Sequence, residues 1–464
     1  MSITQILLLV LIAILCGVVK HPRYRNTLLT LSSLLFYYHL QPATPIRSLD
    51  FWLPTFAILL GLLAWIAIQG NLRRGLKEGF SALLIVLLSV VAVSANRYLA
   101  ICCLTATRPP QLGTVVLFLI VSLTLSALIL SRFALRIRLT ALILILVVIF
   151  ISLKTPEISF LMSKFLRTLQ AQDRRFSAAD DLAWLGISYI LFRLLHILLD
   201  IRTGRLQGAN LTEIIPYLFF FPTLLAGPIV RFPQFREQLN AYPQTQDFVE
   251  GMRRIFIGLF RKFVLADSLA LLALSPQNAS QILSPTYLWI ALLAYALRIY
   301  FDFSGYTDIA IGSARLVGIR LPENFNAPYL KTSLIQFWNS WHITLADWFR
   351  AYVFNPLTRK LRSSSTPEWL TILLPQLTTM LLIGLWHGIT PNFLVWGAWH
   401  GMGLFINNRW NAWSRTRPIK IPLPIQNALT WTLTFGYVTL GWVWFLMPTF
   451  GSSLAVFQKL FGYG

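Results

Sequence analysis

The sequence predicts an all-α, polytopic transmembrane helical bundle, and three observations support this fold class. First, 56% of the 464 residues are hydrophobic and only 12% are charged, whereas a soluble globular chain has roughly 25% charged residues. Second, many apolar stretches approach the roughly 20 residues that a helix needs to cross a bilayer. Third, basic residues gather at every second connection between these stretches, which is the charge pattern of a multi-pass protein.

The apolar stretches extend over the whole chain, and we expect about 11 to 14 membrane helices, some of them short, broken or re-entrant. The candidates are residues 3–19, 27–40, 51–68, 80–95, 115–130, 139–153, 184–199, 214–230, 255–274, 287–303, 369–386, 392–407 and 431–446. The first stretch lacks a basic start and a small-residue cleavage site, so we expect a retained helix rather than a signal peptide. We expect residues 1–464 to form one membrane-embedded domain.

The formal net charge of +22 follows the order of the spans. Lysines and arginines lie after the first, third and fifth spans, within residues 20–25, 73–77 and 132–138. This pattern places those connections in the cytoplasm and the N-terminus outside it. Topology and contact with the lipid bilayer account for the charge, so we expect no nucleic-acid partner. The expected location is the inner (cytoplasmic) membrane.

The two ends of the chain differ in character. Residues 1–154 contain hardly any ionisable group inside a span, which is typical of a helical scaffold. From Gly186 to about Gly462, polar residues, aromatic residues and prolines interrupt the apolar stretches. Such residues usually face the interior of a bundle and mark a functional pathway, so we expect 186–462 to be the catalytic part. The cysteines, Cys16, Cys102 and Cys103, lack the spacing of a metal site.

Histidines are the best candidates for chemistry, because imidazole titrates near neutral pH and can accept a proton from an alcohol. Three of the six each follow a tryptophan: His342, His387 and His400. An indole beside the imidazole can exclude water and keep the base neutral. His21 and His39 lie at the ends of early helices, where an interfacial role is expected. His196 precedes Asp200 by four residues, which favours a local pair.

His387 stands out by its surroundings. An apolar stretch leads into it, and Gly388 and Pro391 then break the helix. The imidazole is therefore predicted to lie at a helix end, in a turn inside the bundle that leaves room for a ligand. A base at that place could take the proton from a hydroxyl while backbone amides polarise an acyl carbonyl.

Two carboxylates, Asp302 and Asp308, lie in another polar segment. Arg298 and Asp302 are four residues apart and would meet on one face of a helix. Both a structural ion pair and a place in the wall of a reaction chamber remain open for Asp302. The spacing of six residues puts the two aspartates on different helix faces, which disfavours paired acid/base catalysis.

Six ordered motifs carry a family resemblance over residues 186–462. They are Gly186-Ile187-Ser188-Tyr189, the run 220–231, the run 300–308, the run 322–329, Phe337-Trp338-Asn339-Ser340-Trp341-His342 and Gly384-Leu385-Trp386-His387-Gly388. With these motifs the chain resembles the membrane-bound O-acyltransferase (MBOAT) family, in the branch of bacterial alginate O-acetylases and teichoic-acid D-alanyl transferases. Asn339-Ser340 stands where the alginate branch commonly has a basic pair, which leaves the substrates open.

The resemblance implies a central tunnel or funnel that reaches His387 from both sides of the membrane. It makes His387 the catalytic histidine and His342 the second signature histidine. The side chains expected to bind the substrates are Trp386, Trp341, Asn339, Asp302 and Asn324.

The resemblance also implies the substrates, with no bound cofactor. The donor is an acyl thioester, on a phosphopantetheinyl carrier protein or as acyl-CoA. The acceptor is a hydroxyl of an extracytoplasmic polysaccharide, a teichoic-acid-like polymer or a lipid-linked glycan, and an extracytoplasmic partner protein is expected. Two alternatives remain: a non-catalytic transporter or flippase, and a structural subunit with a degenerate site.

Overall fold

A computed structural model describes residues 1–70, 72–99, 104–417 and 421–463. Within these ranges the regular structure is helical, apart from one isolated bridge between Phe325 and Trp341. The all-α prediction is therefore confirmed. Cys102 and Cys103 lie outside the described residues, while Cys16 is buried in the first helix.

Seven helices of the described chain are long and apolar enough to cross a membrane. They are α3 (Leu49–Ile68), α4 (Leu72–Leu99), α5 (Leu112–Ser131), α6 (Leu135–Lys154), α13 (Pro285–Leu316), α17 (Glu368–His387) and α19 (Leu423–Leu446). The first helix, α1 (Ile3–Val18), is apolar but shorter. The chain is thus a multi-pass membrane protein, and the further expected spans and the central tunnel stay predictions.

The chain forms two compact units. The N-terminal unit comprises Met1–Ile255 and Ala310–Leu321, and the C-terminal unit comprises Phe256–Ile309 and Pro322–Gly464. The N-terminal unit also contains α2 (Pro22–His39), α7 (Pro156–Leu169), α8 (Ile187–Arg202), α9 (Leu211–Leu218), α10 (Phe232–Gln238) and most of α11 (Thr245–Leu259). The single functional domain expected from the sequence, with its parts 1–154 and 186–462, stays a prediction.

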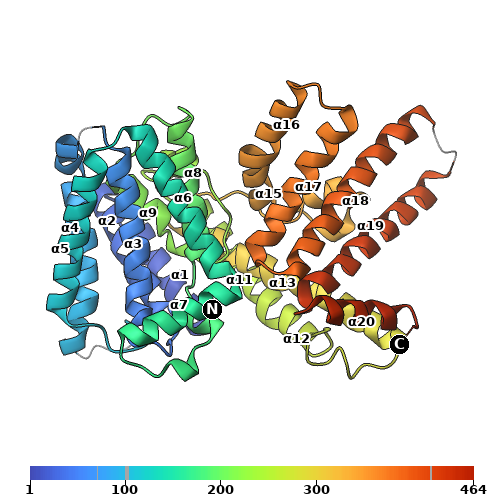
Figure 1. Ribbon diagram of the computed structural model, residues 1–464, viewed down its shortest axis with the longest axis horizontal. Coiled ribbons are helices and arrows are strands. Elements are labelled where there is room, and N and C mark those ends of the chain that lie inside the picture. Colours follow the sequence, from blue (N-terminus) through green and yellow to red (C-terminus); the bar gives the residue numbers. More distant parts are fainter. Residues whose placement is uncertain (71, 100–103, 418–420, 464) are drawn as a thin grey trace. The chain divides into compact units, whose positions relative to one another are not determined.

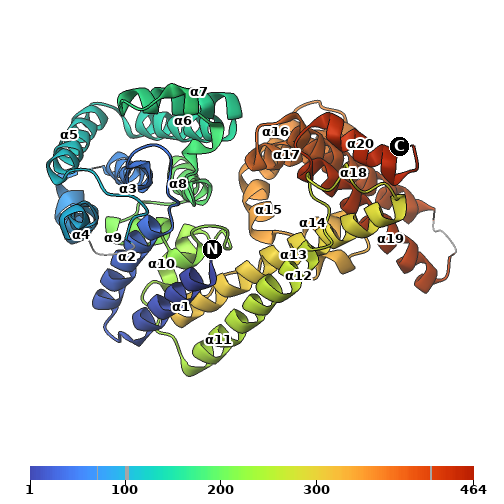
Figure 2. The ribbon, with the colours of Figure 1, turned by 90° about the horizontal axis from the view of Figure 1, so that it is seen from below.

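Helix α3 is the core of the N-terminal unit. Its sequence is apolar on every side, and a helix of that kind is stable only when other elements surround it. Helices α2, α4, α5, α6, α8 and α9 all contact it, as Figures 1 and 2 show. Its one carboxylate, Asp50, accepts hydrogen bonds from the backbone N and Oγ1 of Thr107, at 2.7 and 2.5 Å. In α8, His196 Nε2 lies 3.3 Å from Asp200 Oδ2, which confirms the predicted pair.

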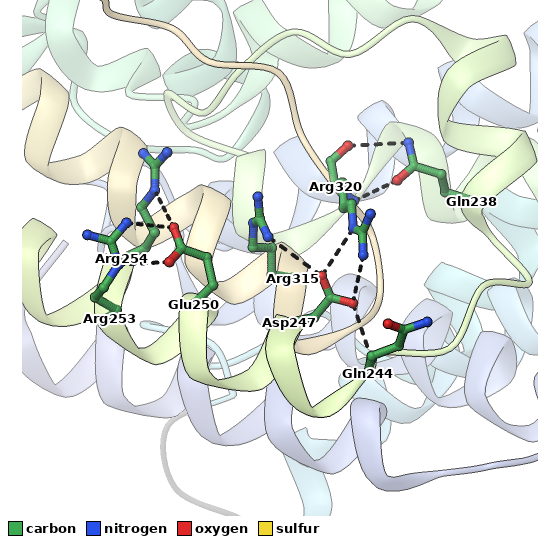
Figure 3. Close-up of polar contacts among 8 residues, drawn as sticks. All are labelled: Gln238, Gln244, Asp247, Glu250, Arg253, Arg254, Arg315 and Arg320. Carbon is green, nitrogen blue, oxygen red and sulfur yellow. Dashed lines mark hydrogen bonds and ion pairs between the residues drawn. The ribbon is translucent and has the colours of Figure 1, made fainter.

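Ion pairs join α11 to the end of α13 within this unit (Figure 3). Asp247 is buried and lies 3.6 Å from Arg315 Nη1 and 3.1 Å from Arg320 Nε. One turn along α11, hydrogen bonds from Arg253 lower the pKa of Glu250 to about 2. Both carboxylates therefore stay charged: Asp247 ties α11 to Arg315 and Arg320, while Glu250 pairs with Arg253 and Arg254 of its own helix.

The same two helices approach each other through glycine. A Cβ atom built on Gly312 of α13 would lie 2.5 Å from the carbonyl oxygen of Gly251 in α11. Small residues at such a position let helix backbones pack closely in a membrane. The contact therefore depends on the missing side chain.

Replacing Gly312 by alanine is expected to lower the melting temperature of the purified protein, because the methyl group collides with backbone rather than with a flexible side chain. Overpacking of this kind costs about 1–3 kcal/mol. Gly436→Ala in α19 is the matched control, since its Cβ would meet nothing within 4 Å. The control should melt at the same temperature or higher, and equal effects of the two changes would contradict the interpretation.

The C-terminal unit contains the candidate catalytic residues. Besides α13 and α17 it holds α12 (Asp267–Ala270), α14 (Leu334–Trp338), α15 (Ile343–Phe349), α16 (Asn355–Arg362), α18 (Pro391–Thr416), α19 and α20 (Phe450–Leu460). Helix α18 contacts both α17 and α19, as Figure 1 shows. Two π-helical segments, Phe260–Ala266 and Arg350–Phe354, interrupt the helices of this unit. Such segments are frequent at functional sites.

Candidate functional site

His387 is the last residue of α17, and α18 begins at Pro391. The helix therefore breaks where the sequence predicts. The imidazole is half-buried and has aromatic neighbours on several sides. Its ring centroid lies 4.6 Å from that of Trp386, 4.7 Å from Phe445, 5.6 Å from Trp396 and 5.8 Å from Phe393. These rings limit the access of water to the imidazole without sealing it.

Glycines bring α17 and α18 together at this place. A Cβ atom on Gly384 would lie 2.2 Å from the carbonyl oxygen of Phe393, and one on Gly397 would lie 2.6 Å from that of Met380. The helix backbones therefore touch one turn before His387. This close approach places Phe393 and Trp396 of α18 against the imidazole.

His342 lies at the N-cap of α15 in the left-handed region of backbone space, with φ 43° and ψ 53°. That conformation is unfavourable for a residue other than glycine and persists where neighbours fix it. Asn324 supplies the restraint, because its backbone oxygen accepts from Ile343 N at 3.0 Å and its Oδ1 lies 3.1 Å from His342 Nδ1. The imidazole is 3% exposed, and its Nε2 has no hydrogen-bond partner among the residues that the structure describes. Burial lowers the pKa of His342 to about 3, so the ring is neutral.

Asn324 itself is completely buried. Besides His342, its Oδ1 accepts from the backbone N and Oγ1 of Thr344, at 3.3 and 2.9 Å. The bridge between Phe325 and Trp341 continues this pairing along the loop. The geometry gives Asn324 a positioning function for the His342 loop, whereas the sequence suggested contact with substrate.

The two signature histidines lie on either side of one indole. The ring of Trp386 is 6.0 Å from that of His342 and 4.6 Å from that of His387, between centroids. Trp386 is buried. The structure thus brings together three of the expected site residues, with Trp386 as the contact between the histidines.

Trp341 packs among further aromatic side chains, and Trp442 connects it to Phe445 beside His387. Its neighbours are Tyr329, Phe337 and Trp442, with ring centroids 5.6, 5.7 and 5.2 Å away. The side chain is 5% exposed. Its place in this packed cluster is that of a core residue supporting the loop before His342.

A cavity of about 220 Å³ lies beside α17. Its lining includes the polar side chains of Asn339, Arg350, Gln376, Thr379 and Asn408 and the apolar ones of Ile335, Trp338, Ala346, Phe354, Met380, Ile383 and Leu404. Arg350 Nη2 donates to Asn339 Oδ1 at 2.7 Å, so the expected residue Asn339 does face this cavity. The residues of α17 in the lining have helical spacing, and the next position on that face is His387.

The ion-pair partner of Asp302 differs from the predicted one. It forms an ion pair with Lys262, and among the described residues Arg298 is not its partner. Asp308 pairs with Arg261, at 2.5 Å from Nη1 to Oδ2. The pairing of Asp302 with Arg298 was therefore wrong, because the π-helical segment Phe260–Ala266 supplies the nearer cation. Asp302 is exposed and does not line the cavity.

His400 occupies a fully buried place on α18. Its ring packs 4.9 Å from that of Trp396 and 5.1 Å from that of Trp338, between centroids, and within the described part of the chain neither ring nitrogen has a hydrogen-bond partner. Trp396 also contacts His387, and Trp338 lines the cavity. These two tryptophans and Arg350 were not predicted as site residues, because their relation to His387 arises only from helix packing.

Asn324→Ala is expected to destabilise the purified protein by about 1–3 kcal/mol, because it leaves buried donors of the His342 loop without their acceptor. Thermal unfolding in detergent measures the loss. Asn326→Ala is the matched control: that residue is exposed and takes part in the loop only through its backbone N. A control effect as large as that of Asn324 would show that the loop does not depend on the buried amide.

Comparison with known proteins identifies the family of the chain. The model of the membrane-bound O-acyltransferase (MBOAT) family matches residues 80–448, most of the chain. The probable alginate O-acetylase AlgI of Pseudomonas aeruginosa is 36% identical over 284 residues, 60% of this chain and 52% of that protein. The peptidoglycan O-acetyltransferase of Helicobacter pylori is 33% identical, covering 57% of this chain and 50% of that protein.

A teichoic acid D-alanyltransferase of Streptococcus thermophilus is 33% identical over 239 residues, 49% of this chain and 58% of that protein. The chain therefore spans about half the length of the curated relatives it matches. The range matched by the family model, 80–448, includes His342, His387 and His400.

Proposed function

The chain belongs to the membrane-bound O-acyltransferase family, and from this premise we propose that it transfers an acyl group to a hydroxyl of an extracytoplasmic polymer. The observation that carries the proposal is the position of His387, half-buried at the broken end of α17 and one turn beyond Ile383, the last α17 residue in the lining of the cavity. Its relatives are named for acylation of alginate, peptidoglycan and teichoic acid. The acceptor proposed here is accordingly a polysaccharide, a teichoic-acid-like polymer or a lipid-linked glycan of the cell envelope.

The proposed reaction is direct acyl transfer. The acceptor oxygen attacks the carbonyl carbon of a thioester, the new C–O bond forms, and the C–S bond breaks. His387 takes the hydroxyl proton and returns it to the departing thiolate, so the reaction needs no redox partner. A positioned base contributes about 10² to 10⁴-fold, and the orientation of both substrates adds to this.

The neighbouring residues have supporting functions in this mechanism. Trp386, Phe393, Trp396 and Phe445 restrict water around His387, which protects the thioester from hydrolysis. The imidazole of His342 is uncharged and contacts the indole of Trp386. The fixed loop of Asn324 keeps that arrangement in place.

The donor is proposed to enter the cavity beside α17. The amide and guanidinium groups of Asn339, Arg350, Gln376 and Asn408 can hydrogen bond to the amides of a phosphopantetheine arm. Acyl-CoA and an acyl carrier protein both present this arm. Helix α16 ends in exposed Arg359, Lys360 and Arg362, and these cations would suit the acidic surface of a carrier.

The proposed location is the inner membrane, with the N-terminus outside the cytoplasm. In that orientation the donor is cytoplasmic and the acceptor extracytoplasmic, and an extracytoplasmic partner protein would present the polymer. The topology follows from the alternation of basic connections.

His387→Ala is expected to abolish acylation of the envelope polymer, with a loss of at least about 10²-fold, because the proton acceptor is gone. Mass spectrometry of envelope glycans from cells that express the variant in a deletion strain measures the product. Immunoblotting of membranes verifies that the variant still accumulates. His21→Ala, at an exposed helix end, is the control and should restore acylation fully. Restored acylation by the His387 variant would reject the assignment.

Ile383→Trp is expected to reduce use of the donor, because the larger side chain fills the cavity one turn before His387. The donor KM should rise several-fold in a membrane assay. Leu382→Trp is the matched control on the same helix, since Leu382 is exposed and outside the cavity lining. A similar rise in both variants would argue against donor entry along this face.

A further inference from the structure

A second, apolar cavity lies in the N-terminal unit, distant in sequence from the histidine motifs. It has a volume of about 490 Å³ and is enclosed by α3, α5, α6 and α7. Figure 2 shows these four helices grouped together, with α3 in contact with α5 and α6, and α6 in contact with α7. The lining is formed by aliphatic and aromatic side chains with three serines: Ser122, Ser126 and Ser152. Ser126 is satisfied by the carbonyl of Ser122 at 2.5 Å, so the cavity offers a ligand almost only apolar surface.

A smaller hollow of about 100 Å³ adjoins it, because Leu153 and Trp184 line both. This hollow is the polar end, with Lys154 and Ser188 in its lining. Lys154 Nζ lies 6.0 Å from the centre of the Phe150 ring. Lys154 is the one ionisable side chain in the lining of the two spaces.

The position of the two spaces along the spans matches the depth profile of a lipid. On α3 and α5 the lining residues, such as Leu60 and Leu123, lie in the middle of the helix, at the depth of the hydrocarbon core. On α6 they lie in the last two turns and lead to Lys154, the final residue of that span. The end of a span is the depth of the lipid headgroups, where lysine attracts anionic lipid.

We propose that this site binds one anionic glycerophospholipid of the surrounding bilayer. One acyl chain occupies the apolar cavity, and the phosphate lies beside Lys154. Trp184 marks the boundary between the two parts, and its Nε1 is held by a hydrogen bond to Tyr37 Oη at 2.8 Å. Most of the surface of helices α5 and α6 is not covered by protein, so an acyl chain of the lipid can enter between them from the bilayer.

A phospholipid fits better than another protein segment. The cavity is too narrow for a helix. An acyl chain, in contrast, has no polar group that would need a hydrogen-bond partner there. A neutral lipid would gain the apolar contacts but not the attraction of Lys154. The assignment concerns the scaffold and does not depend on the proposed acyl transfer.

Native mass spectrometry of the purified full-length protein tests the site. The protein is incubated in detergent with phosphatidylglycerol or with phosphatidylcholine, and the retained lipid is counted. The wild-type protein should retain one phosphatidylglycerol more tightly than phosphatidylcholine. Lys154→Gln should reduce that preference about fivefold, as expected for one lysine near a headgroup. Lys164→Gln, an exposed lysine on α7 outside the site, should leave it unchanged.

Filling the cavity tests the acyl chain. Ser126→Phe should lose the retained lipid, whereas Thr124→Phe, on the exposed side of α5, should keep it. Should Ser126→Phe fail to accumulate, Ser122→Leu makes the same test with a smaller change. The proposal is overturned if wild-type protein retains both lipids equally, if Lys154→Gln keeps the full preference, or if the filled cavity still retains lipid. None of these outcomes depends on acyltransferase activity.

Discussion

A lipid bilayer provides no hydrogen-bond partners for the backbone, and this constraint governs where the chain can stop being helical. The break after α17 meets this constraint because it leaves few backbone groups without a hydrogen-bond partner. Gly388 N still donates to Gly384 O at 3.3 Å, and Pro391, at the first turn of α18, has no N–H that needs an acceptor. The turn can therefore lie beside an apolar span and leave His387 at a helix end, where a side chain can meet a ligand.

The aromatic surroundings of His387 depend in turn on how closely α17 and α18 approach. Gly384 and Gly397 remove the side chains that would separate the two backbones. In a bilayer the hydrophobic effect does not drive helices together, so such close packing supplies much of the association. The residues that fix the fold of the C-terminal unit are thus also the ones that place Trp396 against the imidazole.

The features predicted from the sequence were those that one helix determines by itself. The break at His387 and the pair of His196 with Asp200 follow from turn residues and from the spacing of four along a helix. The same spacing failed for Asp302, whose partner Lys262 comes from another segment. That contact needs close packing of Gly258 against Gly305, where a Cβ atom would lie 2.5 Å from a carbonyl oxygen. Spacing along one helix contains no information about such an approach, and the cavity beside Trp338 was missed for the same reason.

The shape of that cavity bears on which donors the proposed reaction can use. Its lining on α17 begins at Gln376, eleven residues before His387, and at 1.5 Å per residue this separation is about 16 Å. A donor whose bulky part stays in water must therefore carry its acyl group on a long, flexible arm. A thioester on phosphopantetheine has such an arm, and its amides can hydrogen bond to Asn339 and Arg350 on the way. A compact activated acyl group, such as an acyl phosphate, would gain neither the reach nor these contacts, which is why we propose a thioester donor.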